Sequence, residues 1–221
     1  MAFKFASVVA FIVKERVEKG KHQQIVCGMN LGSYWMGNMI YDYFLYCIVA
    51  GFVIGMCVAL DIKSLVEGDA LLSTTLLFFL LGFSNIPFTY VISNFFTSYG
   101  TAQGIVYFFN FIWGGVFPII ILILRWLDFN GSAVIGEGVS WLLRVIPAYA
   151  FGEGMINLGS VEILNSTSSE DYEIFDMSLS LAPILFLAWT SIFYIVILFI
   201  IENLQSNETF MRCFTSETKI D

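Results

Sequence analysis

Residues 33–60 read SYWMGNMIYDYFLYCIVAGFVIGMCVAL, with Asp42 as the one charged side chain. A helix needs about 20 mostly apolar residues to cross roughly 30 Å of hydrocarbon. These 28 residues would form a helix of about 42 Å, so its first third should lie among lipid headgroups. The stretch predicts a transmembrane helix.

The composition of the whole chain agrees with this prediction. Of its 221 residues, 58% are hydrophobic and 13% are charged, which leaves too few polar side chains to cover a soluble globule. Residues 70–92, 102–124 and 181–201 also meet the length test, and the ten-residue alternation of a membrane β-barrel does not appear. We expect an all-α polytopic membrane protein with its bundle in residues 33–201.

The N-terminal residues look like part of a longer helix. Residues 6–13 are apolar but too short to cross a membrane, and the chain opens without the ordered regions of a signal peptide. We therefore expect residues 1–13 to be the end of a truncated transmembrane helix and the chain to be a fragment. An intact short protein is the alternative.

The distribution of charge predicts the orientation. Residues 1–32 hold five of the ten Lys and Arg residues and carry +3, which favours a cytoplasmic position for the loop 14–32. Residues 125–180 carry −6 and should lie outside, whereas the tail 202–221, at −2, should return to the cytoplasm. This exterior acidity indicates no nucleic-acid partner, and Asn130 and Asn165 are possible glycosylation sites there.

Several kinds of site are excluded by the residue inventory. One histidine and no Cys-x-x-Cys leave no metal site, and the cysteines offer no exterior disulfide. The chain has no Gly-x-x-x-x-Gly-Lys-Ser/Thr loop for a nucleotide phosphate and no Gly-x-Ser-x-Gly motif. We expect no catalytic residue and no cofactor on this chain.

Two faces of the 33–60 helix are unusual. Small residues recur every fourth position at Cys47, Gly51, Gly55 and Ala59, which suits close helix packing either within the chain or against another half of an assembly. Near the start of the helix, a polar face is predicted to hold Tyr34, Trp35, Asn38 and Asp42. We interpret Asp42 as an interfacial anchor, with a polar cavity as the alternative.

The later helices should be irregular. Pro87 lies within 70–92 and predicts a kink or break near Ile86, and Gly114, Gly115 and Pro118 favour irregularity in 102–124. Within 125–180, residues 139–158 are apolar but interrupted by Pro147, Gly152 and Gly154. They suit a re-entrant exterior helical hairpin, although a full crossing, which would reverse 181–201, is the alternative.

Three groups of motifs resemble one family. They are Glu15-Arg16-Val17 with Lys21-His22-Gln23-Gln24, Gly28, Tyr34-Trp35-Met36-Gly37-Asn38 and Asp42; then Gly82-Phe83-Ser84, Pro87, Tyr90 and Phe95-Phe96; then residues 147–156, PAYAFGEGMI. Together they resemble the A subfamily of ABC transporters, which are lipid transporters. The resemblance implies the later helices of one ABC-2 type transmembrane domain, a permease that moves lipids between leaflets.

The resemblance also implies partners. A nucleotide-binding domain, on the same chain or a separate subunit, would bind ATP and Mg²⁺, and a second transmembrane domain would complete the transporter. The loop 14–32 would hold the coupling helix that docks on the nucleotide-binding domain. This docking role falls on Val17, Glu18, Lys19, Lys21, His22, Gln23 and Gln24.

Other interpretations remain open at this level. The charged segment could act as a topology signal alone. A channel or secondary transporter should show a filter, paired intramembrane charges or inverted repeats, and none is evident. A non-transporting scaffold would need a binding module, for which 202–221 is too short.

Overall fold

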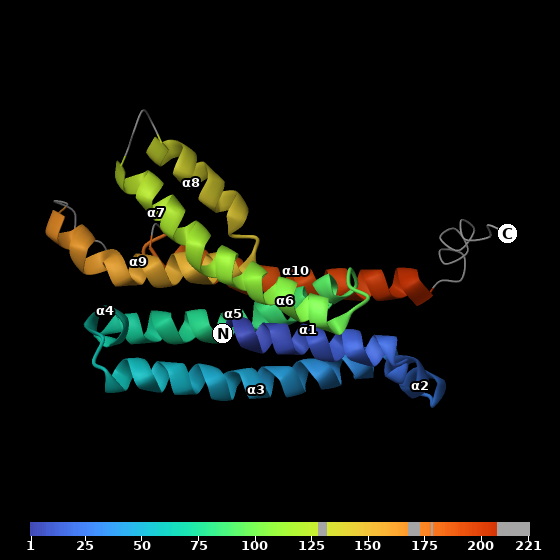
Figure 1. Cartoon of the computed structure of the whole chain (residues 1–221). Coiled ribbons are helices and arrows are strands. Elements are labelled where there is room, and N and C mark those ends of the chain that lie inside the picture. The colour runs from blue at the N-terminus through green and yellow to red at the C-terminus, as the bar shows by residue number, and fades with distance from the viewer. Residues whose placement is uncertain (128–131, 168–172, 178, 207–221) are drawn as a thin grey trace.

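The computed structural model describes residues 1–127, 132–167, 173–177 and 179–206, and these form a bundle of helices (Figure 1). The helices are α1 (Ala2–Val17), α2 (Gly20–Val26), α3 (Leu31–Ala59), α4 (Lys63–Val66), α5 (Asp69–Ser93), α6 (Tyr99–Phe111), the π-helix η1 (Ile112–Val116), α7 (Phe117–Leu127), α8 (Ser132–Leu143), α9 (Pro147–Thr167) and α10 (Leu181–Ser206). The described residues contain no strand.

Four helices in the described part of the chain are long and apolar enough to cross a membrane: Leu31–Ala59, Asp69–Ser93, Tyr99–Arg125 and Leu181–Leu204. They coincide with the four segments expected from the sequence. Among them α5 is the most enclosed, with 61% of its most apolar window buried against 17% for α3. Helix α5 is therefore the centre of the bundle, and it contacts α1, α3, α4, α9 and α10.

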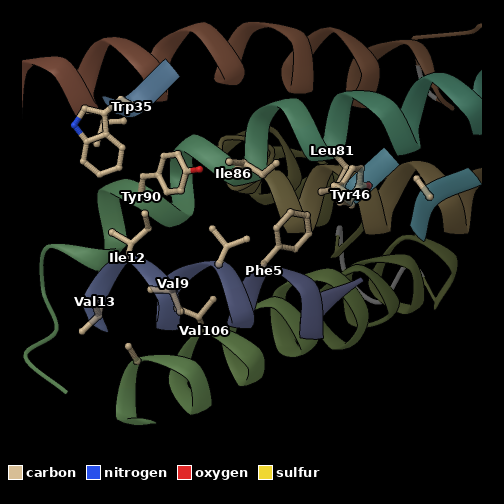
Figure 2. Close-up of a cluster of buried hydrophobic side chains, with 14 of the residues drawn as sticks. Phe5, Val9, Ile12, Val13, Trp35, Tyr46, Leu81, Ile86, Tyr90 and Val106 are labelled. Carbon is tan, nitrogen blue, oxygen red and sulfur yellow. The ribbon is translucent and has the colours of Figure 1, made fainter. Parts of the chain in front are cut away.

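The main core lies between α1, α3, α5 and α6. Figure 2 shows Phe5, Val9 and Ile12 of α1 directed towards α5 and α6. From α5, Ile86 and Tyr90 meet this row, and both are almost fully buried. Since lipid is as apolar as these side chains, close packing and polar contacts hold the helices together rather than the hydrophobic effect alone.

The two ends of the bundle differ. At one end, which we call the α2 end, lie α2, the α5–α6 connection and the last turns of α10 (Figure 1). The polypeptide turns sharply from α1 into α2 at Lys19, which adopts a left-handed conformation (φ 61°). It then enters α3 after Asn30, whose side chain accepts a hydrogen bond from the Gly32 amide at 3.1 Å and so caps the helix.

At the opposite end, which we call the hairpin end, α8 folds back along α7 and α9 returns outwards (Figure 1). A short turn at residues 144–146 joins α8 to α9. The segment that was ambiguous in the sequence is therefore two helices of an inward-pointing hairpin and not one continuous helix. This arrangement fits the re-entrant interpretation, in which α10 keeps its expected direction.

Of the irregularities expected in the later helices, the one in residues 102–124 is found. Residues Ile112–Val116 form a π-helix, in which each backbone bond spans one residue more than in an α-helix. Pro87, by contrast, lies inside α5, which continues without interruption from Asp69 to Ser93. The expected break near Ile86 is therefore not found, whereas a kink there, the other form of the prediction, stays a prediction.

The small-residue face of α3 makes no close helix contact at its glycines within the described residues, so packing against another half of an assembly, the second interpretation, stays a prediction. A Cβ added at Gly51 or Gly55 would meet nothing within 4 Å in the described structure, and Ala59 is exposed and Cys47 half-buried. The face of α3 that packs carries Asp42, Tyr46 and Ala50 instead. The close approach is made by Gly82 of α5, where a Cβ would overlap the ring of Tyr46.

Candidate functional site

The α2 end carries a set of partly buried polar contacts that fix α2 to the bundle. We call these contacts, made by Glu15, Arg16, Lys21, Tyr34 and Glu202, the α2 platform. Each joins α1 or α2 to a different long helix, and the bonded pairs Glu15–Tyr34 and Lys21–Glu202 are 19 and 181 positions apart in sequence. No local helical pattern brings them together.

Arg16 links the end of α1 to the end of α5. Its guanidinium donates to the Ser93 carbonyl at 2.5 Å, to the Phe96 carbonyl at 2.6 Å and to Asn94 Oδ1 at 3.2 Å. These acceptors lie at the carboxyl end of α5, where helix carbonyls lack partners and favour a cation. Burial lowers the pKa of Arg16, while Glu202 acts in the opposite direction, and an arginine stays charged at neutral pH.

Lys21 links α2 to α10 and α3. Its Nζ lies 2.5 Å from Glu202 Oε1, and the two side chains are 17% and 5% exposed. The same ammonium lies 4.9 Å from the centre of the Trp35 ring, which adds a cation–π contact. Because both partners are largely removed from water, this ion pair is a structural link between distant helices.

Glu15 completes the platform. Its Oε2 accepts from the Tyr34 hydroxyl at 2.6 Å, and its Oε1 accepts from Gln24 Nε2 at 3.1 Å. One carboxylate therefore joins α1 to both α2 and α3. Tyr34, expected on the polar face at the start of α3, is a buried hydrogen-bond donor.

These contacts divide the residues expected to dock on a partner. Lys21 and Gln24 are half-buried and bond to Glu202 and Glu15, so their polar groups already have partners within the chain; their docking role stays a prediction. Val17, Glu18, Lys19, His22 and Gln23 are exposed. Two apolar neighbours on α2 join them, since Ile25 is 38% and Val26 72% exposed.

A second polar cluster lies inside the core, near the middle of α3. Asp42 is 7% exposed; its Oδ1 lies 3.3 Å from Lys4 Nζ and its Oδ2 accepts from the Tyr90 hydroxyl at 2.7 Å. Interpreting Asp42 as an interfacial anchor was therefore wrong, because α1 and α5 enclose it and supply its partners. Asn38, one turn earlier, is half-buried. Lys4 could have been recognised as the partner of Asp42 only if α1 and α3 were already known to be neighbours.

A third polar cluster lies in the hairpin. Glu153 of α9 accepts from Arg144 through both oxygens, at 2.7 and 3.0 Å, and from Arg125 at 2.9 Å. Arg125 also donates to Ser140 Oγ at 2.6 Å, and the Arg144 guanidinium lies 4.6 Å from the Trp141 ring centre. Sequence reasoning missed this cluster, although Arg144 and Glu153, buried in an apolar stretch, were the available signal.

The structure describes some of the remaining residues singled out in the sequence and not others. Pro147 begins α9, and Gly152 and Gly154 lie at close contacts of α9 with η1 and α5. Asn130 lies outside the described residues, as does the side chain of Asn165. Among the described residues no group of three or more His, Cys, Asp or Glu side chains could hold a metal ion.

The described structure thus defines a multi-pass helical membrane protein with polar clusters enclosed between its helices and an anchored helix at one end. Residues 1–200 match the family described as ABC-2 family transporter protein, and the chain belongs to that family.

Its relatives are members of the A subfamily of ABC transporters. The human retinal-specific phospholipid-transporting ATPase ABCA4 is 31% identical over 159 residues, which are 72% of this chain and 7% of that protein. Human ATP-binding cassette sub-family A member 13 is 27% identical over 69% of this chain and 3% of its own length. The mouse glucosylceramide transporter ABCA12 is 27% identical over 69% of this chain and 6% of its own length. The chain spans a small part of each relative.

Proposed function

We propose that this chain is the permease part of an ATP-driven ABC exporter that moves lipids across or between membrane leaflets. Family membership supports an ABC transporter permease, and the names of two relatives, a phospholipid-transporting ATPase and a glucosylceramide transporter, support lipid as the cargo. The structural observation that carries the proposal is the α2 platform. It holds α2 firmly from within and leaves the outer face of α2 exposed.

In this proposal the α2 end faces the cytoplasm. The basic charge of residues 1–32 supports that orientation. A nucleotide-binding domain, on the same chain or on a separate subunit, docks on the exposed face of α2 through Val17, His22, Gln23, Ile25 and Val26. ATP and Mg²⁺ bind to that domain, and a second transmembrane domain completes the lipid path.

The platform explains how a push on α2 could move the bundle. Arg16 joins α1 to the end of α5, and Lys21 joins α2 to Glu202 of α10. Glu15 joins the same corner to α3 through Tyr34. Because these bonds are short, charged and partly shielded from water, we expect a shift of α2 to displace α3, α5 and α10 with it.

The test uses the full-length protein in proteoliposomes, with ATP hydrolysis and lipid translocation measured together. Val26→Asp places a charge on the exposed face of α2 without touching the platform. We expect lipid-stimulated ATP hydrolysis to fall at least fivefold while the amount of inserted protein stays unchanged. Lys63→Glu, an exposed charge change at the hairpin end, is the control and should have no effect.

Two results would count against the proposal. Normal coupling in Val26→Asp would remove the docking role of α2 and leave its charges as a topology signal. ATP hydrolysis that responds to lipid while no lipid changes leaflet would contradict the export step itself.

A further inference from the structure

A cavity of about 230 Å³ lies between α1, α5, α6, η1 and α9. Its wall is mostly apolar and includes the rings of Phe5, Phe111 and Phe151, while Asn85 and Asn110 supply its polar side chains. None of its lining residues belongs to the α2 platform, the Asp42 cluster or the hairpin cluster. The cavity is therefore separate from the three polar clusters described above.

The hydrogen bonds of the two asparagines fix the orientation of both amides. Asn110 Nδ2 donates to the Val106 carbonyl at 2.9 Å, so Asn110 Oδ1 must face Asn85. Asn85 Nδ2 donates to that oxygen at 2.7 Å. The opposite assignment of the Asn85 amide would place two acceptor oxygens against each other. Asn85 Oδ1 therefore faces away from Asn110.

Asn85 Oδ1 has no hydrogen-bond partner among the described residues, and the Asn85 side chain is fully buried. A buried carbonyl oxygen without a donor is costly, and such groups are rare in native proteins. The oxygen can accept up to two hydrogen bonds. The amide pair therefore requires a donor and offers no charge, which selects a neutral ligand with an O–H or N–H group.

Glycine makes the room for such a ligand. Gly114 is tightly packed, because a Cβ there would lie 3.3 Å from the Ala148 carbonyl oxygen. Gly115 has no such contact, since its Cβ would meet nothing within 4 Å, and it lines the cavity. Both glycines belong to η1, and π-helical turns occur frequently at functional sites.

We propose that this cavity binds the hydroxyl end of a neutral lipid, whose O–H donates to the Asn85–Asn110 pair. An apolar cavity of about 150 Å³ is enough to hold benzene, so the 230 Å³ here takes a ring or a short chain segment. The rest of the molecule lies outside the cavity. An acyl chain carries no donor, and a phosphate or choline group would be charged against an apolar wall, so phospholipids fit poorly.

Entry occurs beside Asn110. That residue is 7% exposed and Asn85 is fully enclosed, so the ligand meets the Asn110 edge of the pair first. Contact with Asn85 Oδ1 then requires the side chains at this edge to turn aside. Sterols and diacylglycerols share the required chemistry, and the experiment distinguishes these two sources.

The test is photolabelling of the full-length protein in membranes without ATP, so that its outcome does not depend on transport. Clickable photoreactive cholesterol and clickable photoreactive diacylglycerol are used in parallel, and labelled peptides are located by mass spectrometry. We expect one of the two to label the segments around Phe111 and Ala148. Gly115→Val should reduce that labelling at least fivefold by filling the cavity, whereas Gly104→Val, at an exposed glycine of α6, should leave it unchanged.

A second arm tests the hydroxyl. The labelling lipid should be displaced about ten times better by its unlabelled hydroxyl form than by the corresponding ketone, which cannot donate. The double variant Asn85→Leu/Asn110→Leu should abolish this preference. Equal displacement by alcohol and ketone, labelling that ignores Gly115→Val, or absence of label from the cavity segments would each overturn the proposal.

Discussion

Gly152 of α9 packs directly against Gly114 of η1, so closely that a Cβ on Gly152 would overlap the Gly114 carbonyl oxygen. The same Cβ would also lie 2.9 Å from Pro118 Cγ. Backbone atoms on one side and a rigid proline ring on the other leave no flexible group that could move aside. This contact fixes the hairpin to the third long helix.

Gly152→Ala should therefore separate α9 from η1 and destabilise the protein by about 1–3 kcal/mol, the usual cost of overpacking. The measurement is the unfolding midpoint in detergent micelles. Gly159→Ala on the same helix is the matched control, because its Cβ would meet nothing within 4 Å. Equal midpoints for the two variants would show that the close contact is not part of the folded state.

Glu153→Gln should be the most destabilising conservative change in the hairpin. It leaves the buried Arg144 and the partly buried Arg125 without their shared carboxylate, and removing one partner of a buried ion pair costs about 3–5 kcal/mol. Unfolding midpoints and protease sensitivity near the hairpin report the effect. Glu137→Gln, at an exposed position of α8, serves as control, and a comparable loss there would contradict the cluster's role.

The link between Lys21 and Glu202 predicts a charge-swap rescue. Lys21→Glu places two carboxylates together where their side chains are 17% and 5% exposed, so it should lower both stability and coupling. Adding Glu202→Lys restores opposite charges and should recover at least half of each loss. Lys19→Glu tests the exposed charge alone and should leave stability unchanged; a double variant no better than Lys21→Glu would exclude the direct pairing.

Asp42→Asn should leave the Lys4 ammonium unpaired within the core while the new amide still accepts from Tyr90. We expect a loss of about 3 kcal/mol or more. Adding Lys4→Met removes the stranded charge and should return most of that stability, as judged by unfolding in micelles. Additive losses in the double variant would mean that the two residues do not interact.

The four long helices could be predicted from the sequence because length and apolar content alone decide a crossing in lipid. Their bounds agree with the structure within a few residues, as for 181–201 and Leu181–Leu204. The hairpin could also be predicted from the sequence, since Pro147 and two glycines interrupt an apolar run that is too short to cross the membrane.

The roles of individual polar residues could not be predicted, because they depend on partners far away in sequence. Asp42 was interpreted as an anchor from its depth along one helix, whereas Lys4 and Tyr90 from two other helices enclose it. The family resemblance implied a docking role for Lys21, and its ion-pair partner Glu202, 181 positions away, could not be recognised from the sequence. The every-fourth-residue face of α3 shows the same limit, since spacing shows which residues share a face and not what lies opposite.

The π-turn at Ile112–Val116 sets the angular phase of the third crossing helix. Because one turn takes an extra residue there, the side of α6 that meets α1 and the side of α7 that meets α8 and α9 do not follow one 3.6-residue repeat. Deleting a single residue in this turn would rotate all of α7 relative to α6 and present a different row of side chains to the hairpin. In a related chain with one residue fewer at this position, different side chains of α7 would therefore contact α8 and α9.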